Sequence, residues 1–498
     1  MINFVIFQNT GMESSNAFQG CGYCYVTGKS ETTYAEIKVD GEKKIVPKGS
    51  VTVFPFQRQL QLRTHEEVLA APSVLRNLQQ EDKSIKSYKG IKEPSLMAKI
   101  MPDIVNGMAI DLMHLLEGIV KRLLELWTSS THHKKDFSIR GEIAAINEKL
   151  EKIRPPSFIA RFPRTLDEVN NWKASEFKNF LLYYGLPTLL GLLPVELLDN
   201  FAELVYGIYT LSQCSITKKE FEESEKALDH FLEEFQKLYG LRYMTMNFHL
   251  LQHFASSVKQ IGASWVSSCF IFENYNGKIL NLIHGTRFAD NQLASNLLLM
   301  AQFPISVAEL PEGKVKDFCN NCSENFHKLN LNENICKGIF SVGNYKVIEK
   351  PNASMQNVLT SLKKPKPCKL KAFHRLKKGK FLFASQHYCK DLQFENSYVS
   401  YKDNNSICFG IVQQFVKICN SSCSSANCKC PGEFFTFVEK CAVDSFNKSS
   451  SSLKKIQHIK KFQRSNCFAL IKIENLESVV IKISENYLAV PLNTVEKE

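Results

Sequence analysis

The sequence lacks an apolar run long enough to cross a lipid bilayer. Its most apolar stretch, residues 180–198, is interrupted by Gly185, Pro187, Gly191 and Pro194. A membrane-spanning helix needs about 20 predominantly apolar residues in succession. The N-terminal stretch also lacks the basic region and the small-residue cleavage site of a secretory signal peptide. We therefore expect a protein with no membrane partner, in a compartment that keeps its thiols reduced.

Disulfide bonds are not expected, although the chain has 16 cysteines. Closely spaced cysteines in a reducing compartment are more often metal ligands or ordinary thiols. Cys21 and Cys24 form a C-x-x-C pair, which has the spacing of half a tetrahedral zinc site. No second C-x-x-C pair lies nearby, so further ligands would come from a distant segment. Two ordinary cysteines are the alternative, and a redox motif is disfavoured because no βαβ pattern surrounds the pair.

Two further groups of cysteines are weaker metal candidates. Both have irregular spacing, so ordinary loop cysteines are the alternative. The first group consists of Cys319, Cys322, His327 and Cys336, and the second of Cys419, Cys423, Cys428 and Cys430.

Acidic residues are absent between residues 351 and 390, where ten Lys and Arg residues occur. The whole chain carries a formal net charge of +12. A basic stretch in a basic protein favours an anionic partner, with the phosphates of nucleic acid as the first candidate. A solvated linker is the alternative for the same residues.

Apolar spacing divides the chain into a long helical part and a β-rich tail. Three- and four-residue spacing predicts an amphipathic helix over residues 104–127 and a helical block over 136–303. Within that block, Thr217 followed by Glu220 predicts a capping box at the start of a helix. Residues 380–498 instead contain short alternating runs, which predict a small β-barrel or β-roll.

The stretch 244–287 contains the most informative polar residues. His249 and His253 are four residues apart in a helical pattern. They therefore share one helix face, about 5–6 Å apart, and can bind one metal ion. An ordinary polar helix face is the alternative. Glu273 follows among aromatic residues and isoleucine, where a carboxylate is either a functional acid or a salt-bridged core residue.

Several motifs in a fixed order give the chain a family resemblance. They are GCGYC, VDGEKKIVP…FPF…LRTHEE, IDLMHLLEGIVKRLLELW, WKASEFKNFLLYYGLPTLLGLLP, MTMNFHLLQHF, FENYNG and HGTR, spread over residues 15–300. In this order they resemble the transposase of CACTA (EnSpm-type) DNA transposons of the animal branch. That family is similar to the RNase H-like DDE recombinases, which include the catalytic subunit of the vertebrate V(D)J recombinase. Such enzymes use two Asp and one Glu to hold two divalent metal ions for DNA cleavage and strand transfer.

The resemblance implies a role for each of the marked residues. Cys21, Cys24, His249 and His253 would bind one structural Zn²⁺, and Glu273 would be the catalytic glutamate. The resemblance also implies a DNA partner, a nuclear location and no small-molecule substrate. Mg²⁺ or Mn²⁺ would be needed only if the DNA cleavage activity is retained. The resemblance leaves open whether the protein forms a homodimer.

The chain departs from the family pattern where the two catalytic Asp residues should stand. Both would precede the cysteine pair, yet residues 1–20 contain no Asp. Because Mg²⁺ is held through few but necessary carboxylates, we expect that DNA cleavage and strand transfer are lost. One alternative is an active DDE transposase, from an incomplete gene model or with Asp103 or Asp111 as the replacement. Another is a non-enzymatic protein-interaction scaffold.

The patterns and the resemblance together predict a mainly α fold with a β-rich end. Residues 1–304 would form a partial RNase H-like transposase core with a large helical insertion. Residues 305–370 would be a linker that is basic towards its end, and residues 371–498 a small β-rich domain. The expected function is that of a transposon-derived, zinc-binding, DNA-associated nuclear protein without nuclease activity.

Overall fold

The structure is a computed structural model of the chain. It describes residues 11–39, 42–323, 331–336, 338–361, 369–404, 406–419 and 432–492. Contacts divide the chain into two compact units. Unit 1 comprises Met1–Glu151, Pro163–Cys269 and Asn447–Ile456, and unit 2 comprises Lys152–Phe162, Phe270–Phe446 and Gln457–Glu498.

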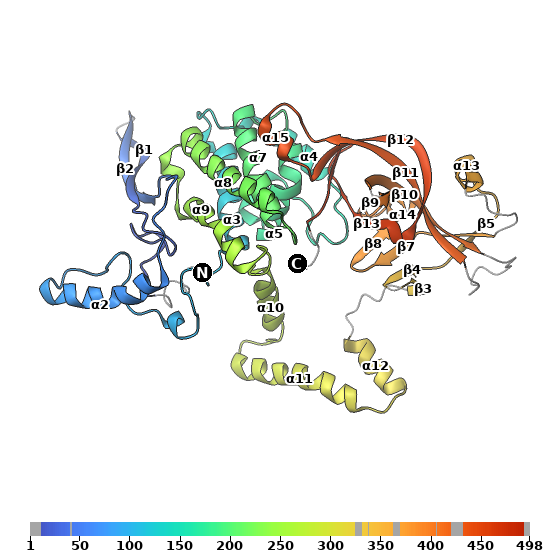
Figure 1. The fold of residues 1–498 in the computed structure, drawn as a ribbon, viewed down its shortest axis with the longest axis horizontal. Helices are drawn as coiled ribbons and strands as arrows, with labels where there is room; N and C mark the ends of the chain where they lie inside the picture. Colours follow the sequence, from blue (N-terminus) through green and yellow to red (C-terminus); the bar gives the residue numbers. More distant parts are fainter. Residues whose placement is uncertain are drawn as a thin grey trace. The chain divides into compact units, whose positions relative to one another are not determined.

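Unit 1 is mainly helical (Figure 1). Its α-helices are α2 (His65–Glu81), α3 (Leu112–Thr128), α4 (Ile143–Glu151), α5 (Ala174–Asn179), α6 (Gly185–Leu189), α7 (Val195–Leu211), α8 (Lys218–Tyr239), α9 (Met246–Ile261) and α15 (Ser451–Lys455). Helix α3 begins directly after Asp111, whose side chain accepts hydrogen bonds from two backbone N–H groups of the first turn. Helix α8 begins after the predicted capping box, in which Thr217 and Glu220 bond each other's backbone N–H groups.

The core of unit 1 contains an aromatic cluster that joins α3, α7, α8 and α9. Phe235 of α8 stacks on Phe248 of α9, with ring centroids 4.2 Å apart. Trp127 of α3 packs edge-on against Phe201 of α7, with centroids 5.4 Å apart. The indole Nε1–H of Trp127 donates to the hydroxyl of Tyr239 at 2.9 Å. Because all these rings are buried, their large apolar area fixes α9, the helix that carries both predicted histidine ligands.

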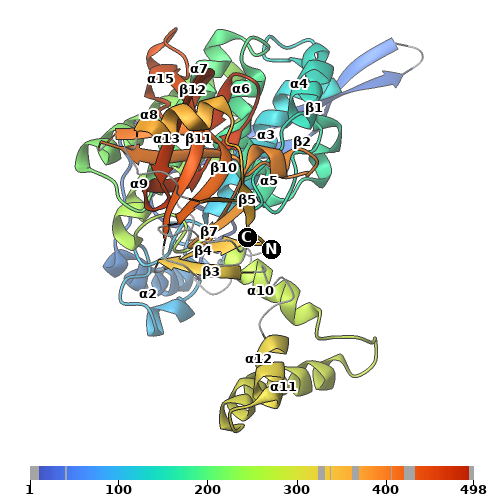
Figure 2. The ribbon, with the colours of Figure 1, turned by 90° about the vertical axis from the view of Figure 1, so that its right-hand side faces the viewer.

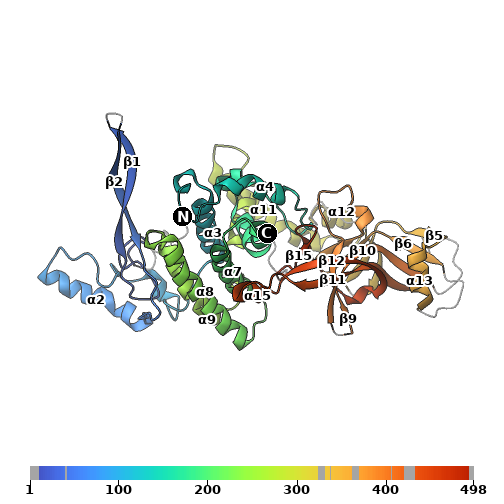
Figure 3. The ribbon, with the colours of Figure 1, turned by 90° about the horizontal axis from the view of Figure 1, so that it is seen from above.

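A long antiparallel hairpin in unit 1 consists of β1 (Lys29–Val39) and β2 (Glu42–Val53), as Figure 3 shows. Phe54, the next residue after β2, donates its backbone N–H to the carbonyl of Met244 at 2.7 Å. Phe54 itself is buried, with 1% of its surface exposed. The end of the hairpin is therefore attached to the segment that leads into α9.

Unit 2 is built around antiparallel strands (Figure 2). They are β3 (Leu331–Cys336), β4 (Ile339–Val342), β5 (Lys346–Ile348), β6 (Leu370–Phe373), β7 (Arg375–Lys378), β8 (Phe381–Ala384), β9 (Tyr398–Asp403), β10 (Ser406–Cys419), β11 (Gly432–Ser445), β12 (Ile459–Lys472), β13 (Leu476–Val479), β14 (Ile481–Lys482) and β15 (Tyr487–Ala489). Nine of them form one sheet with the main order β13-β9-β10-β11-β12-β15-β14; in addition, β6 pairs with β10, and β5 pairs with β6. A four-stranded sheet has the order β3-β4-β7-β8.

Bulges in the longest strands allow the large sheet to curl. Strands β10, β11 and β12 have 14 residues each. The register between β10 and β11 shifts between Val412 and Gln414, and that between β11 and β12 shifts next to Cys441. An extra residue in one strand bends the strand and increases its twist. The buried residues Phe373 and Phe415, whose rings stack at 5.2 Å, belong to the core of this sheet.

The α-helices of unit 2 are α10 (Phe270–Leu280), α11 (Ala289–Glu309), α12 (Lys314–Ser323), α13 (Ala353–Ser361) and α14 (Gln386–Cys389). Helix α13 covers part of the large sheet, where Met355 is buried with Phe435 and Phe437 of β11. Within the described ranges, no helix has both the length and the apolar character needed to cross a membrane.

The prediction of a mainly α fold is wrong. Helix accounts for 44% and strand for 23% of the described residues, and the large sheet dominates unit 2. The predicted RNase H-like core also needs correction, because β1 and β2 are the strands that pair in the described part of unit 1. That core was implied by the resemblance alone. Bulges interrupted the two-residue alternation of β10 to β12, so the sequence suggested shorter strands than the 14-residue strands that form.

Candidate metal centre

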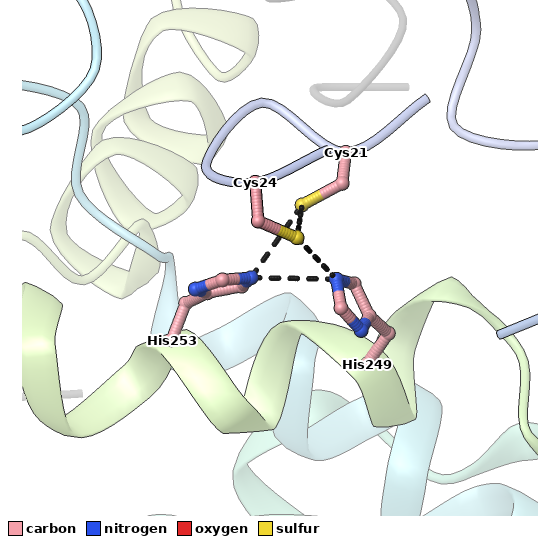
Figure 4. Close-up of side chains that lie close together, drawn as sticks. All are labelled: Cys21, Cys24, His249 and His253. Atoms are coloured by element: carbon pink, nitrogen blue, oxygen red, sulfur yellow. Dashed lines mark hydrogen bonds between the residues drawn. The ribbon is translucent and has the colours of Figure 1, made fainter. Parts of the chain in front are cut away.

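Four side chains from two distant segments of unit 1 converge at one buried point (Figure 4). Cys21 and Cys24 lie on a loop before β1, and His249 and His253 lie one turn apart on α9. The four residues expose between 0 and 4% of their surface. The structure therefore brings together the four predicted metal ligands.

All four donor atoms lie within 4.8 Å of one another, and four of their six separations match the edges of a small tetrahedron. The two sulfur atoms are 3.7 Å apart, and the two Nε2 atoms are 3.3 Å apart. The Sγ–Nε2 distances are 3.6 Å from Cys21 to His253 and 3.3 Å from Cys24 to His249. Tetrahedral zinc bonded to two thiolates and two imidazoles separates S from S by about 3.8 Å, S from N by about 3.6 Å and N from N by about 3.3 Å. The donor set and its geometry thus fit a zinc ion.

The two thiols of the cluster have opposite pKa shifts. Burial alone would raise the pKa of Cys21, but hydrogen bonds from Cys24, His249 and His253 together lower it well below its usual value. The hydrogen bond to Cys21, followed by burial, raises the pKa of Cys24. A metal cation would favour the thiolate form of both, because thiolate is the form that binds metal.

A buried arginine holds the cysteine loop in place. The Nε–H of Arg63 donates to the carbonyls of Cys21 and Cys24 at 2.9 and 3.0 Å. Its Nη1 donates to the carbonyl of Lys89 at 2.7 Å, and the residue is only 4% exposed. Both cysteine carbonyls are thereby fixed, and so is the direction of the Cα–Cβ bonds that carry the sulfur atoms.

Aromatic rings enclose the two imidazoles. The ring of Tyr23 stacks on His253 with centroids 5.2 Å apart, and the ring of Phe54 stacks on His249 at 5.6 Å. The Nδ1 atom of His249 is buried and has no hydrogen-bond partner in the described part of the chain. The polar contacts of that ring are therefore those of Nε2, which point into the cluster. Tyr23, Phe54 and Arg63 lie within the GCGYC, FPF and LRTHEE motifs of the family resemblance, but the sequence predicted no role for these three side chains.

A close backbone contact requires glycine at the start of the cysteine loop. A Cβ atom on Gly20 would lie 2.3 Å from the carbonyl oxygen of Ser14, well inside the van der Waals contact distance. The backbone N–H of Tyr23 donates to the sulfur of Cys21 at 3.4 Å within the same turn. The GCGYC sequence therefore forms a tight knuckle that directs both sulfur atoms to one side.

Glu273 does not belong to this cluster. It is exposed on α10, an element of unit 2, whereas the four cluster residues belong to unit 1. Among the described residues, neither group of His, Cys and acidic side chains that could hold a metal ion includes it. Its role as a catalytic glutamate stays a prediction.

A second group in unit 1 consists of Asp111, His114 and Cys269, whose candidate donor atoms lie within 4.8 Å of one another. The carboxylate of Asp111 caps α3, bonds the imidazole of His114 and accepts the backbone N–H of Cys269 at 2.8 Å. Burial alone would raise the pKa of Asp111, but these hydrogen bonds lower it. The structure therefore gives the carboxylate a capping and bridging role. Asp103 similarly accepts two backbone N–H groups of its own turn.

The other cysteine candidates receive little structural support. Cys419 is buried at the end of β10, while the residues 420–431 that hold its predicted companions lie outside the described part of the chain. Cys319 lies on α12 and Cys336 on β3, and His327 is again outside the described ranges. The basic stretch 351–390 contributes α13 and the strands β6 to β8, and residues 362–368 within it are not described.

No family model matches the chain, and no curated protein is similar to it at a significant level. The metal centre therefore rests on the geometry of Cys21, Cys24, His249 and His253.

Proposed function

We propose that Cys21, Cys24, His249 and His253 bind one structural zinc ion. The observation that carries this proposal is the convergence of two sulfur and two nitrogen atoms, all buried and all within 4.8 Å of one another, with four of the six distances between them at 3.3 to 3.7 Å. Four protein ligands complete the coordination of zinc and leave no position for water or substrate. Such a site stabilises the fold and performs no chemistry of its own.

The zinc ion would join two segments that are 225 residues apart in the sequence, as measured from Cys24 to His249. Without a bound cation, the two sulfur atoms and the two Nε2 atoms would lie close together in a buried space. With the cation, the loop before β1 would be fixed to α9. The backbone hydrogen bond from Phe54 to Met244 and the hydrogen bonds from Arg63 to the cysteine carbonyls support the same junction.

We further propose that the protein is a DNA-associated, nuclear protein of transposase descent that does not cleave DNA. The order of the sequence motifs and the net charge of +12 support this proposal. The loss of cleavage is supported by the two aspartates closest to the helical motifs. Asp103 and Asp111 accept backbone hydrogen bonds in a turn and in a helix cap, so both carboxylates already have structural roles.

Elemental analysis of the full chain, purified without added metal, tests the zinc proposal. We expect about one zinc ion per chain, and less than about a fifth of that in Cys21→Ser and in His249→Ala, since each removes one of four ligands. The exposed residues of the same unit offer matched controls, Cys214→Ser and His133→Ala, which should keep their zinc. If the wild-type protein is free of zinc and still has the circular dichroism spectrum of a folded protein, the ligand assignment is wrong.

Salt-dependent binding to a fluorescent DNA duplex tests the DNA proposal. Affinity should fall at least tenfold between 50 and 200 mM salt, because each neutralised phosphate releases a counterion. Lys377→Glu with Lys380→Glu, in the basic stretch, should weaken binding further, while Lys218→Glu with Lys219→Glu on the exposed start of α8 should not. No binding at 50 mM salt would contradict the proposal. Mg²⁺-dependent cleavage that Glu273→Gln abolishes would contradict the loss of activity.

A further inference from the structure

The helices α10, α11 and α12 expose an unusual amount of apolar surface. Of the 21 residues of α11, only Val307 is buried, and α10 has no buried residue. Thirteen large apolar side chains of this segment are exposed. They are Ile271, Phe272, Tyr275, Leu280, Phe288, Leu297, Leu298, Leu299, Met300, Phe303, Ile305, Val315 and Phe318.

Helix α11 has a narrow, uncharged polar side, formed by Asn291, Ser295, Gln302 and Ser306, and carries mostly apolar side chains around the rest of its surface. The consecutive residues 297–300 are all apolar, so they point in every direction around the helix axis. Leu298 is 60% exposed, Leu299 63% and Met300 54%. A helix with apolar side chains over most of its circumference is stable in water only when other elements enclose those side chains. The described contacts of α11 include α12, and even with that contact these side chains remain exposed.

The exposed area is sufficient for a stable protein interface. If a large apolar side chain presents about 200 Å² when fully exposed, the six exposed on α11 alone present about 600 Å². The full set of thirteen presents on the order of 1,500 Å² by the same measure. A stable interface takes about 800 Å² from each partner, whereas the largest apolar patch of a typical monomer is about 300–600 Å².

The chemistry of α11 favours a second copy of the same chain as the occupant of this surface. Residues 291–308 contain no Asp, Glu, Lys, Arg or His. Apart from Asp290 and Glu309 at its two ends, which are both acidic, the helix has no charge with which to select an oppositely charged protein, to approach DNA phosphates, or to lie on anionic lipid as basic amphipathic helices do. An uncharged apolar face is complementary to itself, and two copies can meet on it about a twofold axis without like-charge repulsion.

We propose that the segment 270–323, which comprises α10, α11 and α12, is the homodimer interface of this protein. In the dimer, α11 and α12 of one copy pack against the same helices of the other, as in a four-helix bundle. This pairing encloses the apolar side chains that a single copy leaves in water. The inference does not depend on zinc or DNA, since the segment contains neither the proposed ligands nor the basic stretch.

Sedimentation analysis of the full chain between 1 and 50 µM, in 0.5 M salt after nuclease treatment, tests the inference. The wild-type protein should sediment with twice the chain mass of 56.8 kDa. Leu298→Glu with Ile305→Glu places two charges on one face of α11, seven residues apart, and should weaken the dimer at least tenfold. Both side chains are exposed in a single copy, at 60 and 62%, so the variant should keep its circular dichroism spectrum and zinc content.

The matched control introduces charge at equally exposed apolar residues outside the segment. Val195→Glu with Ile100→Glu, at 62 and 74% exposure, should leave the dimer unchanged. A wild-type protein that stays monomeric up to 50 µM, or a dimer that survives the α11 substitutions, would overturn the proposal. Open-ended association of the wild-type protein, without a defined mass of two chains, would do so as well.

Discussion

Stripping zinc from the purified protein is expected to lower the midpoint of thermal unfolding of unit 1 by at least 10 °C. Structural zinc contributes about 10–16 kcal/mol to the folding of zinc-finger peptides. Unit 1 is larger and has its own apolar core, so we expect metal removal to lower its free energy of unfolding by about half as much. A loss of 5 kcal/mol corresponds to about 10–20 °C for a unit of this size.

Tryptophan fluorescence reports this transition selectively. The chain has three Trp residues, and Trp127, Trp172 and Trp265 all belong to unit 1. Treatment with a chelator should shift their transition to lower temperature, and one equivalent of Zn²⁺ should restore it. Cys21→Ser should resemble the stripped protein and respond to neither reagent, while Cys214→Ser should behave like the wild type. If protein shown to be free of zinc unfolds at the original temperature, the ion has no structural role.

Replacing Trp127 with alanine is expected to destabilise unit 1 by about 3–5 kcal/mol, the range for truncating a buried aromatic residue. Trp127 is fully buried, packs edge-on against Phe201 at 5.4 Å and donates to the hydroxyl of Tyr239 at 2.9 Å. The truncation leaves a cavity and also leaves that hydroxyl without its donor. Urea unfolding followed by circular dichroism at 222 nm measures the loss.

Trp127→Phe separates the two contributions of the indole. It keeps most of the ring packing but removes the hydrogen bond, so its cost should be about 1–2 kcal/mol. The Tyr239→Phe variant removes the other partner of the same bond and should cost a similar amount. An alanine variant no less stable than the phenylalanine variant would show that the cavity collapses, and that α3 and α7 are not held by this ring.

Local sequence patterns identified the elements of the metal centre but not how the elements meet. The i, i+4 spacing placed His249 and His253 on one helix face, and the capping box marked the start of α8, since both features depend on neighbouring residues alone. The C-x-x-C spacing marked Cys21 and Cys24. From the residues alone, each pair could equally have been an ordinary feature of a loop or a helix.

The extent of the β-structure could not be read from the same patterns. The strands β10 to β12 owe their 14-residue length to partners far along the chain and contain bulges that break the alternation. The prediction of a mainly α fold failed for this reason. The role of Arg63 could not be predicted either, because it depends on hydrogen bonds to backbone carbonyls of another segment and no sequence spacing indicates such contacts.

The sequence by itself determined two pairs of metal-binding residue types, their local spacing and the helix that carries one pair. Only the tertiary structure decided that the two pairs face each other, with all donor atoms within 4.8 Å of one another in a buried space. The physical reason is the distance along the chain over which each interaction acts. Spacing within a helix or a knuckle is fixed by local backbone geometry, whereas the approach of segments 225 residues apart depends on the packing of the whole of unit 1 around α9.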